Sequence, residues 1–561
     1  MGGLRLGLAA AATLAVFPAL PGHATPAHVH VHVVNQRAQL VALARGRTTP
    51  HNAAQVRQRY LTVARARLEL AGAVGGGSAT AEAFGPVAIA APVKDVSGHT
   101  DVAVLTIPTG QSASTLSVRD GRNGRQLWTR SLDDAWAFDV ARLGAAHRPT
   151  LVVYETSFTG ASDPLGVVDD GEQSNSIVTL DVSTGQLVWA STPVVGTYSV
   201  SPMGFTEVNA LYPAGVLHDR AGDRLLATKT TDGYGFFTSS GQAQDVIYDG
   251  VTGAESSTVS IDLGDADQPR AAPAGDVNGD GSDDWYAFVD GDVASVRAIS
   301  GATGTPLWAK PLPAGGFIDV QPTGDLNHDG HPDVVVGTSS LGESEGTLTA
   351  YAGATGATLM THPGDGAEDL GVIGSEHVIL DWDLSGFGAV SVSALTGAGK
   401  VLWTRTVSIP IAEGESGGGG MEAGTAGDVD GDGVQDVYVD MTYATTHTAG
   451  SATVVVSGRS GRATSGRAIG RPLGFSLDGK GDDFLDALPG AHSWQMTAYD
   501  GRSRHKLWTW RQPVQDKGFL LDVASLPSLR RGAMADFYDG RRTHVFGLLG
   551  ATGHRVWDAI I

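Results

Sequence analysis

The chain of 561 residues contains no cysteine. This absence excludes a disulfide framework, a Cys-x-x-Cys redox pair, Cys-ligated zinc and an iron–sulfur cluster. Basic side chains are also few, with 38 Lys and Arg against 60 Asp and Glu, which gives a formal net charge of −22. A surface of this sign repels phosphate backbones, so we expect no nucleic-acid partner.

Apolar runs long enough to cross a bilayer are also missing after the first two dozen residues. The N-terminus itself has Arg5, an apolar stretch over 6–20 and small residues at 22 and 24, which is typical of a secretory signal peptide. We therefore predict cleavage after residue 24 and a bacterial protein that is secreted, extracellular, monomeric and without a membrane span. The missing cysteines fit a secreted protein that is cross-linked by something other than disulfides.

Residues 25–80 differ in composition from the rest and are predicted to form an N-terminal leader. A His-Val-His-Val-His segment at 28–32 would place three imidazoles on one face of a strand, where they could bind a transition metal. A solvated segment is the favoured interpretation, and its role stays open. Asn52 is predicted to cap a helix, and the Gly-Gly-Gly-Ser run at 75–78 to form a flexible linker.

Glycine is abundant, with 77 residues, and much of it lies in a compound repeat that starts near residue 94. The first half of the repeat is an acidic turn followed by a β-rich run. The second half is a Gly-x-Thr-Gly turn followed by a strand that often carries Leu-Trp, as in 301–308 and 550–557. The chain contains nine copies of this repeat, complete or partial, which we call imprints. They recur at steps of roughly 45 to 75 residues, and each supplies about four short strands.

This period is typical of β-propeller blades. A β-sandwich array would not repeat one signature, and a β-helix would have a much shorter period. We predict an all-β single β-propeller over residues 81–561, with eight blades and with seven or nine as alternatives. The recurring tryptophan is expected to fill the wedge between neighbouring blades rather than to stack on a cofactor.

Three acidic turns carry the most specific chemistry. Oxygen ligands at positions 1, 3 and 5, a carbonyl at position 7 and a carboxylate at position 9 converge in the manner that Ca²⁺ requires. We therefore predict about three calcium sites. The predicted ligands are Asp276, Asn278, Asp280, the Ser282 carbonyl and Asp284; Asp325, Asn327, Asp329, the His331 carbonyl and Asp333; and Asp428, Asp430, Asp432, the Val434 carbonyl and Asp436.

Two other interpretations of these turns are an EF-hand loop and a solvated Asp/Gly-rich turn. An EF-hand requires Glu at position 12, where this chain has Ala287, Val336 and Val439. A merely solvated Asp/Gly-rich turn is the second, but three copies with the same ligand order favour calcium. Two weaker copies, at 381–389 and 478–486, are expected to bind no metal, because Ala389 takes position 9 of one and Lys480 takes position 3 of the other.

These motifs resemble known families. The acidic turn followed by an apolar strand is similar to the FG-GAP/VCBS-type repeat of secreted and surface β-propellers, including the integrin α-subunit head. The Gly-x-Thr-Gly turn with Leu-Trp resembles the blade motif of quinoprotein (PQQ) dehydrogenase-like propellers. The resemblance covers about five-sixths of the chain and implies the calcium ligands named above, but a shared fold does not imply a shared function.

Three enzymatic hypotheses find little support. A quinoprotein dehydrogenase usually has a disulfide of adjacent cysteines over its cofactor, which this chain cannot form. A hydrolase is suggested only by Gly-Glu-Ser-Gly-Gly at 414–418, and neither an Asp nor a His can be paired with Ser416. A calcium-dependent polysaccharide lyase would need a Lys, Arg or Tyr base, and the sequence singles out none.

A binding function requires less, because a propeller presents its loops on a rigid scaffold. Candidate loops span 157–174, 230–244 with Tyr234, Phe236 and Phe237, and 413–422. We predict a secreted calcium-binding propeller that acts as an extracellular binding or adhesion module for carbohydrate or protein ligands, with no catalytic or cofactor-binding residues assigned. A secreted enzyme on the same scaffold is the alternative.

Overall fold

The computed structural model describes residues 87–560 apart from short gaps. The gaps are 96–97, 108–112, 134, 145–146, 163–167, 202–203, 209–210, 221, 232, 236–237, 240–241, 263–268, 290–293, 314–315, 341–345, 365, 374–375, 387–388, 409–416, 446–448, 464–470, 474, 490–492, 514–518 and 539–541. The predicted signal peptide at 1–24 and the leader at 25–80, with its histidine segment and its helix, lie outside the described residues.

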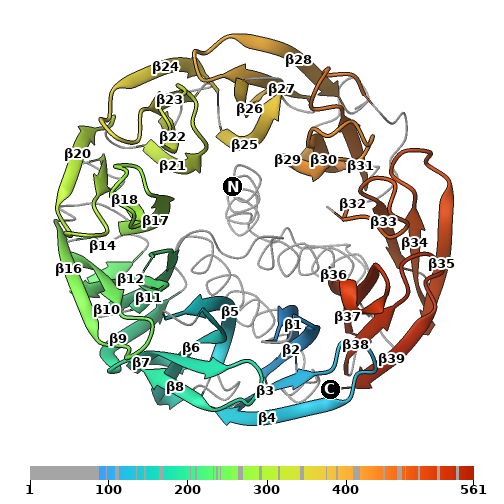
Figure 1. Cartoon of the computed structure of the whole chain (residues 1–561), viewed down its shortest axis with the longest axis horizontal. Coiled ribbons are helices and arrows are strands. Elements are labelled where there is room, and N and C mark those ends of the chain that lie inside the picture. The colour runs from blue at the N-terminus through green and yellow to red at the C-terminus, as the bar shows by residue number, and fades with distance from the viewer. Residues whose placement is uncertain are drawn as a thin grey trace, which may run out of the picture. The chain divides into compact units, whose positions relative to one another are not determined.

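The described residues form nine antiparallel β-sheets, which we number as blades 1 to 9 in chain order. In most of them four consecutive strands pair in sequence, as β1 to β4 show in Figure 1. Blades 1 to 3 contain β1 (Val87–Lys94), β2 (Thr100–Ile107), β3 (Ser114–Arg119) and β4 (Gln126–Leu132); β5 (Ala135–Leu143), β6 (Arg148–Ser162), β7 (Val168–Asp181) and β8 (Leu187–Ala190); and β11 (Leu211–Leu217), β12 (Arg224–Thr231), β15 (Gln242–Tyr248) and β16 (Glu255–Asp262).

The next three blades repeat the same order without insertions between their strands. Blades 4 to 6 contain β17 (Pro269–Gly275), β18 (Asp284–Val289), β19 (Ser295–Ile299) and β20 (Pro306–Pro311); β21 (Gly316–Thr323), β22 (Asp333–Ser340), β23 (Thr347–Tyr351) and β24 (Thr358–Pro363); and β25 (Gly366–Ile373), β26 (Glu376–Gly386), β27 (Ala389–Thr396) and β28 (Val401–Ser408).

Blade 7 has three described strands, and blades 8 and 9 have four each. They contain β29 (Gly417–Gly427), β30 (Asp436–Thr445) and β31 (Ala449–Val456); β32 (Arg471–Pro472), β33 (Phe484–Pro489), β34 (Ser493–Tyr499) and β35 (Lys506–Pro513); and β36 (Phe519–Leu526), β37 (Gly532–Tyr538), β38 (Thr543–Leu548) and β39 (Arg555–Ile560). The fold class is all-β, as predicted, and the β-propeller has nine blades, which is one of the two alternatives to the eight that we favoured. Each of the nine repeat imprints corresponds to a blade.

Helical structure is nearly missing from the part of the chain that the structure describes. It consists of one 3₁₀ turn at Pro527–Leu529, between β36 and β37. Among the described residues no helix has the length and apolar character needed to cross a membrane.

Blade 2 is the exception in size, because four further strands extend its sheet. They are β9 (Val194–Ser201), β10 (Gly204–Val208), β13 (Gly233–Gly235) and β14 (Thr238–Ser239). The last two come from the insertion between β12 and β15 of blade 3, and β13 pairs with β10. Two of the candidate binding loops, 157–174 and 230–244, are therefore largely strand.

The chain divides into two compact groups of residues, and each has its cores between consecutive blades. In the group that holds 312–487 and 496–509, the cores join blades 5 and 6, 6 and 7, and 7 and 8. In the other group they join blades 1 and 2, 2 and 3, 3 and 4, and 9 and 1. The side chains involved are mostly Val, Leu, Ile and Ala, which pack well on the pleated faces of strands.

The repeated tryptophans fill the wedges, as predicted. Trp128, Trp189 and Trp403 lie on the fourth strand of their blades, and each indole N–H donates a hydrogen bond to a carbonyl of the following blade at 2.7–3.1 Å. The last glycine of the next Gly-x-Thr-Gly turn lies flat against the ring. At Gly253, an added Cβ would lie 2.5 Å from the Trp189 ring, which is too close. The φ angle of Gly253 is +68°, which also favours glycine over residues that have a side chain.

A tryptophan contact of the same kind joins the last blade to the first. Trp557 on β39 donates from its indole nitrogen to the Gly121 carbonyl at 3.0 Å, and its ring lies against Gly124. A shared core that includes Val102, Leu526 and Met534 lies behind this contact. Figure 1 shows β36–β39 in red beside β1–β4 in blue. The two ends of the repeat array are therefore held by side-chain packing, because no strand is exchanged between these two sheets.

Substitution of Gly124 tests this contact, with Gly98 in the same blade as a matched control. Both residues have a positive φ, +70° and +80°, but an added Cβ would lie 2.8 Å from the Trp557 ring at Gly124 and would meet nothing within 4 Å at Gly98. We expect Gly98→Ala to cost about 1 kcal/mol and Gly124→Ala at least about 2 kcal/mol more, because overpacking adds to the backbone strain. Urea unfolding measures both, and equal losses would contradict the packing role of Gly124.

Candidate metal centres

The three acidic turns lie at equivalent places in their blades. Each connects the first strand to the second: β17 to β18 in blade 4, β21 to β22 in blade 5 and β29 to β30 in blade 7. Position 9 of each turn is the first residue of the second strand, namely Asp284, Asp333 and Asp436. The predicted ligands of each site therefore all lie on one continuous turn.

The oxygen atoms at positions 1, 3 and 5 are oriented by the turn's own backbone. The carboxylate at position 1 accepts the N–H groups of positions 5 and 6, and the side-chain oxygen at position 3 also accepts the N–H of position 5, all at 2.8–3.1 Å. The carboxylate at position 5 accepts the N–H of position 7 at 2.9–3.0 Å. These bonds hold the side chains in a short arc around the turn.

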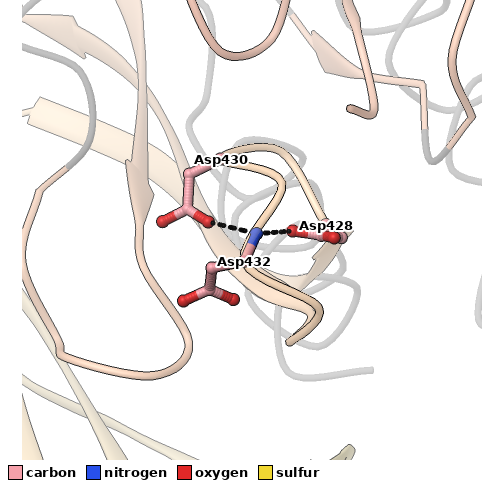
Figure 2. A group of neighbouring side chains, drawn as sticks. All are labelled: Asp428, Asp430 and Asp432. Atoms are coloured by element: carbon pink, nitrogen blue, oxygen red, sulfur yellow. Dashed lines mark hydrogen bonds between the residues drawn. The ribbon is translucent and has the colours of Figure 1, made fainter. Parts of the chain in front are cut away.

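The turn of blade 7 has the most anionic donor set. Carboxylate oxygens of Asp428, Asp430 and Asp432 all lie within 4.8 Å of one another. Figure 2 shows the backbone nitrogen of Asp432 between the carboxylates of Asp428 and Asp430, to which it donates. Arg459 donates to the outer oxygen of Asp432 at 2.9 Å and offsets part of the repulsion among the three charges. Hard anionic oxygens at this spacing fit calcium.

The turns of blades 4 and 5 carry one charge fewer at position 3. There Asn278 and Asn327 each donate from Nδ2 to the carboxylate at position 5, Asp280 and Asp329, at 2.9 Å. Their Oδ1 atoms accept from the backbone, as the Asp430 side chain does. Both oxygen sets fit the same ion, with a lower negative charge than in blade 7.

The carboxylate at position 9 connects the acidic turn to the second half of the repeat. In Asp284 one oxygen accepts the N–H groups of Val277 and Asn278 at 3.0 and 3.2 Å, and the other accepts the N–H of Gly301 at 2.8 Å. Gly301 is the first residue of the Gly-x-Thr-Gly turn, and an added Cβ there would lie 1.8 Å from the Asp283 carbonyl. We call this carboxylate, at Asp284, Asp333, Asp436 and Asp483, the hub aspartate.

The other three hub aspartates make the same contacts. Each has one oxygen on the acidic turn and the other on the first glycine of the following turn, at 2.9–3.0 Å from Gly353, Gly458 and Gly501. All four side chains are fully buried. Burial raises the pKa of Asp284 and Asp483 to about 6 and that of Asp436 to about 7, although the backbone hydrogen bonds act in the opposite direction.

Blade 8 has the hub without the acidic ligand set. Leu477 donates to Asp483 at 2.6 Å, as the residue at position 2 does elsewhere, so Ser476 takes position 1 and the turn is one residue shorter. Lys480 thus takes position 5, not position 3 as we predicted. Its ammonium lies 3.0 Å from Asp478 at position 3. Carboxylate oxygens of Asp478, Asp483 and Asp500 also lie within 4.8 Å of one another. The expectation that this copy binds no metal therefore stays a prediction.

The acidic turns also contact the preceding blade. Asp283, at position 8 of the blade 4 turn, exchanges two hydrogen bonds with the backbone of His218 in blade 3, at 2.7 and 3.1 Å. Asp482 in blade 8 does the same with Asp428 in blade 7, at 3.0 and 2.9 Å. An ion bound at position 1 of blade 7 would therefore lie directly at the junction of two blades.

Several predicted sites are placed differently from what we expected. The weak copy that begins at Asp381 is not a turn: Asp381 lies within β26, and Ala389 begins β27. Ser416 lies outside the described residues, and the glycines that follow it are part of β29. A nucleophile elbow requires a strand-to-helix turn, so this context does not fit the hydrolase hypothesis. Of the candidate loop 413–422, residues 417–422 also belong to β29.

Comparisons with known proteins agree with the blade structure. A family model described as outer membrane protein assembly factor BamB matches residues 242–481, which is less than half of the chain. The chain is a β-propeller with PQQ-like repeats. No curated protein matches it.

Several solved structures are similar to this chain at low identity. A rhamnogalacturonan lyase of family PL11 from Bacillus licheniformis is 13% identical, with a TM-score of 0.41, over 85% of this chain and 92% of that one. The rhamnogalacturonan lyase YesW is also 13% identical, with a TM-score of 0.42, over 85% and 91%. Sqt1 from Saccharomyces cerevisiae is 10% identical, with a TM-score of 0.34, over 74% and 93%. At these values we draw no conclusion about activity from them.

Two buried aspartates allow a test of the hub. Asp245 and Asp483 are both fully buried, and burial raises the pKa of each to about 6. Asp245 accepts from the Thr228 hydroxyl and the Trp285 indole, whereas Asp483 accepts from two backbone N–H groups. An asparagine can satisfy the first pair, because a hydroxyl can also accept, but it leaves a backbone N–H facing its NH₂ group in the second.

Both substitutions remove the cost of an ionised buried carboxylate at pH 7.5, so only their difference reports the unpaired backbone N–H. We therefore expect the free energy of unfolding of Asp483→Asn to lie about 1–3 kcal/mol below that of Asp245→Asn. Asp245→Asn itself should leave the free energy of unfolding of the wild type unchanged or raise it by up to about 3 kcal/mol. Because the folded-state pKa of Asp245 lies above its ordinary 3.8, its stabilising contribution is full below pH 4 and is lost as the pH rises through 6. The difference between wild type and Asp245→Asn should follow that window in urea unfolding at several pH values. Similar losses in both variants would contradict the hub.

Proposed function

We propose that this protein is a secreted, calcium-binding β-propeller of the FG-GAP/VCBS type that acts as an extracellular binding or adhesion module for carbohydrate or protein ligands. The observation that carries the proposal is the set of three acidic turns with the same oxygen order at equivalent places in their blades. The turns in blades 4, 5 and 7 would each hold one Ca²⁺ through positions 1, 3 and 5 and the carbonyl at position 7, with the hub aspartate beside them.

Calcium would act on stability rather than on chemistry. In blade 7 the two positive charges of the ion would offset most of the charge of three aspartates whose oxygens lie within 4.8 Å of one another, at a turn that is bonded to the next blade. Removal of the ion would leave those charges to repel each other at the junction of the two blades. In a chain without cysteine, metal ions can provide the cross-links that disulfides give to other secreted proteins.

The extension of blade 2 supports a binding function. The β6–β7 hairpin is 14–15 residues long on each side, about twice the length of most strands in the other blades, and β9, β10, β13 and β14 continue its sheet. The blade cores do not need these strands, which are missing from the other eight sheets in the described part of the chain. Elaborations of this kind on a rigid scaffold are where binding surfaces are commonly built.

Calcium titration tests the metal sites. We expect isothermal titration of the chelator-treated protein to give about three sites, and Asp428→Asn to give about two. Asp478→Asn, in the turn that has Lys480, is the matched control and should keep all three. Ca²⁺ at a hundred times its dissociation constant would stabilise the fold by about 2.7 kcal/mol for each site, so EDTA should lower the melting temperature. An unchanged melting curve and no bound calcium would contradict the proposal.

A glycan array probed with the whole secreted chain, with and without EDTA, tests the binding function. We expect binding of a defined group of glycans in calcium that is lost or weakened in EDTA, because loss of the ions from blades 4, 5 and 7 destabilises the propeller that supports the binding surface. A panel of extracellular matrix and cell-surface proteins provides the second arm. Failure to bind any member of either panel in calcium, with a native melting curve, would contradict the proposed function.

A further inference from the structure

The turns between the first and second strands of blades 2 and 3 place two histidines beside an aspartate. His147 is the last residue before β6, His218 follows directly after β11, and Asp223 is the last residue before β12 (Figure 1). These turns have the same place in their blades as the acidic turns of blades 4, 5 and 7. They lack the acidic ligand order and offer imidazole nitrogen together with carboxylate oxygen.

One buried carboxylate faces both imidazoles. Nδ1 of His218 lies 3.2 Å from Oδ1 of Asp223, and Nδ1 of His147 lies 3.9 Å from the same oxygen. The Asp223 side chain is 6% exposed, whereas those of His147 and His218 are 53% and 70% exposed. Ligand atoms at about 2.0–2.1 Å from a tetrahedral Zn²⁺ lie about 3.3–3.4 Å apart. The distance between His218 and Asp223 matches this spacing, and a rotation of the exposed His147 ring would close the remaining gap.

The backbone holds Asp223 at the junction of blades 2 and 3. Its carbonyl accepts the N–H of Gly144 at 3.3 Å, and the Gly144 carbonyl accepts the N–H of His147 at 2.9 Å. An added Cβ at Gly250 would lie 1.9 Å from the same Asp223 carbonyl, so the chain encloses it closely. The position of the carboxylate is therefore fixed by both blades, and the exposed imidazoles are the groups that have room to reorient.

The surroundings of His218 are acidic. Its hydrogen bond to Asp223 raises the pKa of the imidazole, and the charges of Asp223, Asp283 and Asp219 act in the same direction, although burial opposes them. The backbone N–H of His218 donates to Asp283 at 2.7 Å, so blade 4 also holds this residue in place. Asp219 is paired with Arg224. The negative charge of the other two carboxylates favours a cation at this junction.

We propose that His147, His218 and Asp223 bind a divalent transition-metal ion of the zinc class, which would cross-link blades 2 and 3. Two imidazoles and one carboxylate suit Zn²⁺, whereas Ca²⁺ is bound through oxygen ligands. Three protein ligands leave the fourth position of a tetrahedral ion to water. The site shares no ligand with the three calcium turns, and it does not depend on the proposed binding function.

Zinc titration of the whole chain in excess Ca²⁺ tests this site. The chain carries His28→Gln, His30→Gln and His32→Gln, so that the histidine segment of the leader adds no second signal. We expect calorimetry to give one Zn²⁺ site, and zinc to raise the melting temperature because it binds the folded chain. Co²⁺ in place of zinc should give the intense visible absorption that is typical of tetrahedral coordination.

Substitution of either histidine should remove most of the zinc affinity. His147→Gln and His218→Gln should each weaken binding more than tenfold and abolish the tetrahedral Co²⁺ spectrum, because each removes one of three ligands. His362→Gln is the matched control and should keep the full affinity. His362 also pairs with a buried carboxylate, Asp381, at 3.6 Å, but no second imidazole is paired with that carboxylate among the described residues.

The outcomes separate this site from the calcium sites. Melting curves without zinc check that the variants fold, and their calcium titrations should still give about three sites. No zinc binding by the chain in excess Ca²⁺, or binding that either His147→Gln or His218→Gln leaves unchanged, overturns the zinc site. Failure of the calcium titration with zinc binding intact would contradict the proposed function and leave this site in place.

Discussion

One buried carboxylate in each intact repeat holds the two halves of that repeat together. The hub aspartate takes backbone N–H groups from the acidic turn on one oxygen and from the first glycine of the Gly-x-Thr-Gly turn on the other. Blade 8 has the same contact at Asp483, in a turn where Lys480 takes the position of one acidic ligand. The hydrogen bonds of the hub aspartate thus join the two turns of a repeat both where the acidic turn has its full set of acidic residues and where one of them is replaced.

Two kinds of contact join neighbouring blades within the two groups of residues. The tryptophan of one blade bonds to a carbonyl of the next and packs on its glycine, and the acidic turn of one blade bonds to the backbone of the one before it. The first kind is apolar and insensitive to ions, whereas the second carries the concentrated negative charge. An extracellular cation that settles in these turns would stabilise the second kind where it is weakest.

The repeat signature alone predicted the fold class and the position of the acidic turns, because Trp, Gly and Asp recur in fixed order. The number of blades does not follow from the repeat signature alone, because insertions in blades 2 and 3 lengthen the spacing between repeats and add strands to one sheet. The register of blade 8 was missed because the turn is one residue short, which only its hydrogen bonds reveal. The hub role of Asp284 depends on contacts between two turns of the repeat that no spacing in the sequence records.

Hydrogen–deuterium exchange, followed by mass spectrometry in calcium and in EDTA, tests the central claim that the hub aspartates join the two halves of the repeat. The peptides of interest contain Gly301, Gly353, Gly458 and Gly501, whose amides donate to the hubs. We predict that these amides stay strongly protected in both buffers, while exchange at 276–283, 325–332 and 428–435 accelerates in EDTA. Rapid exchange at the four glycines in both buffers would contradict the account.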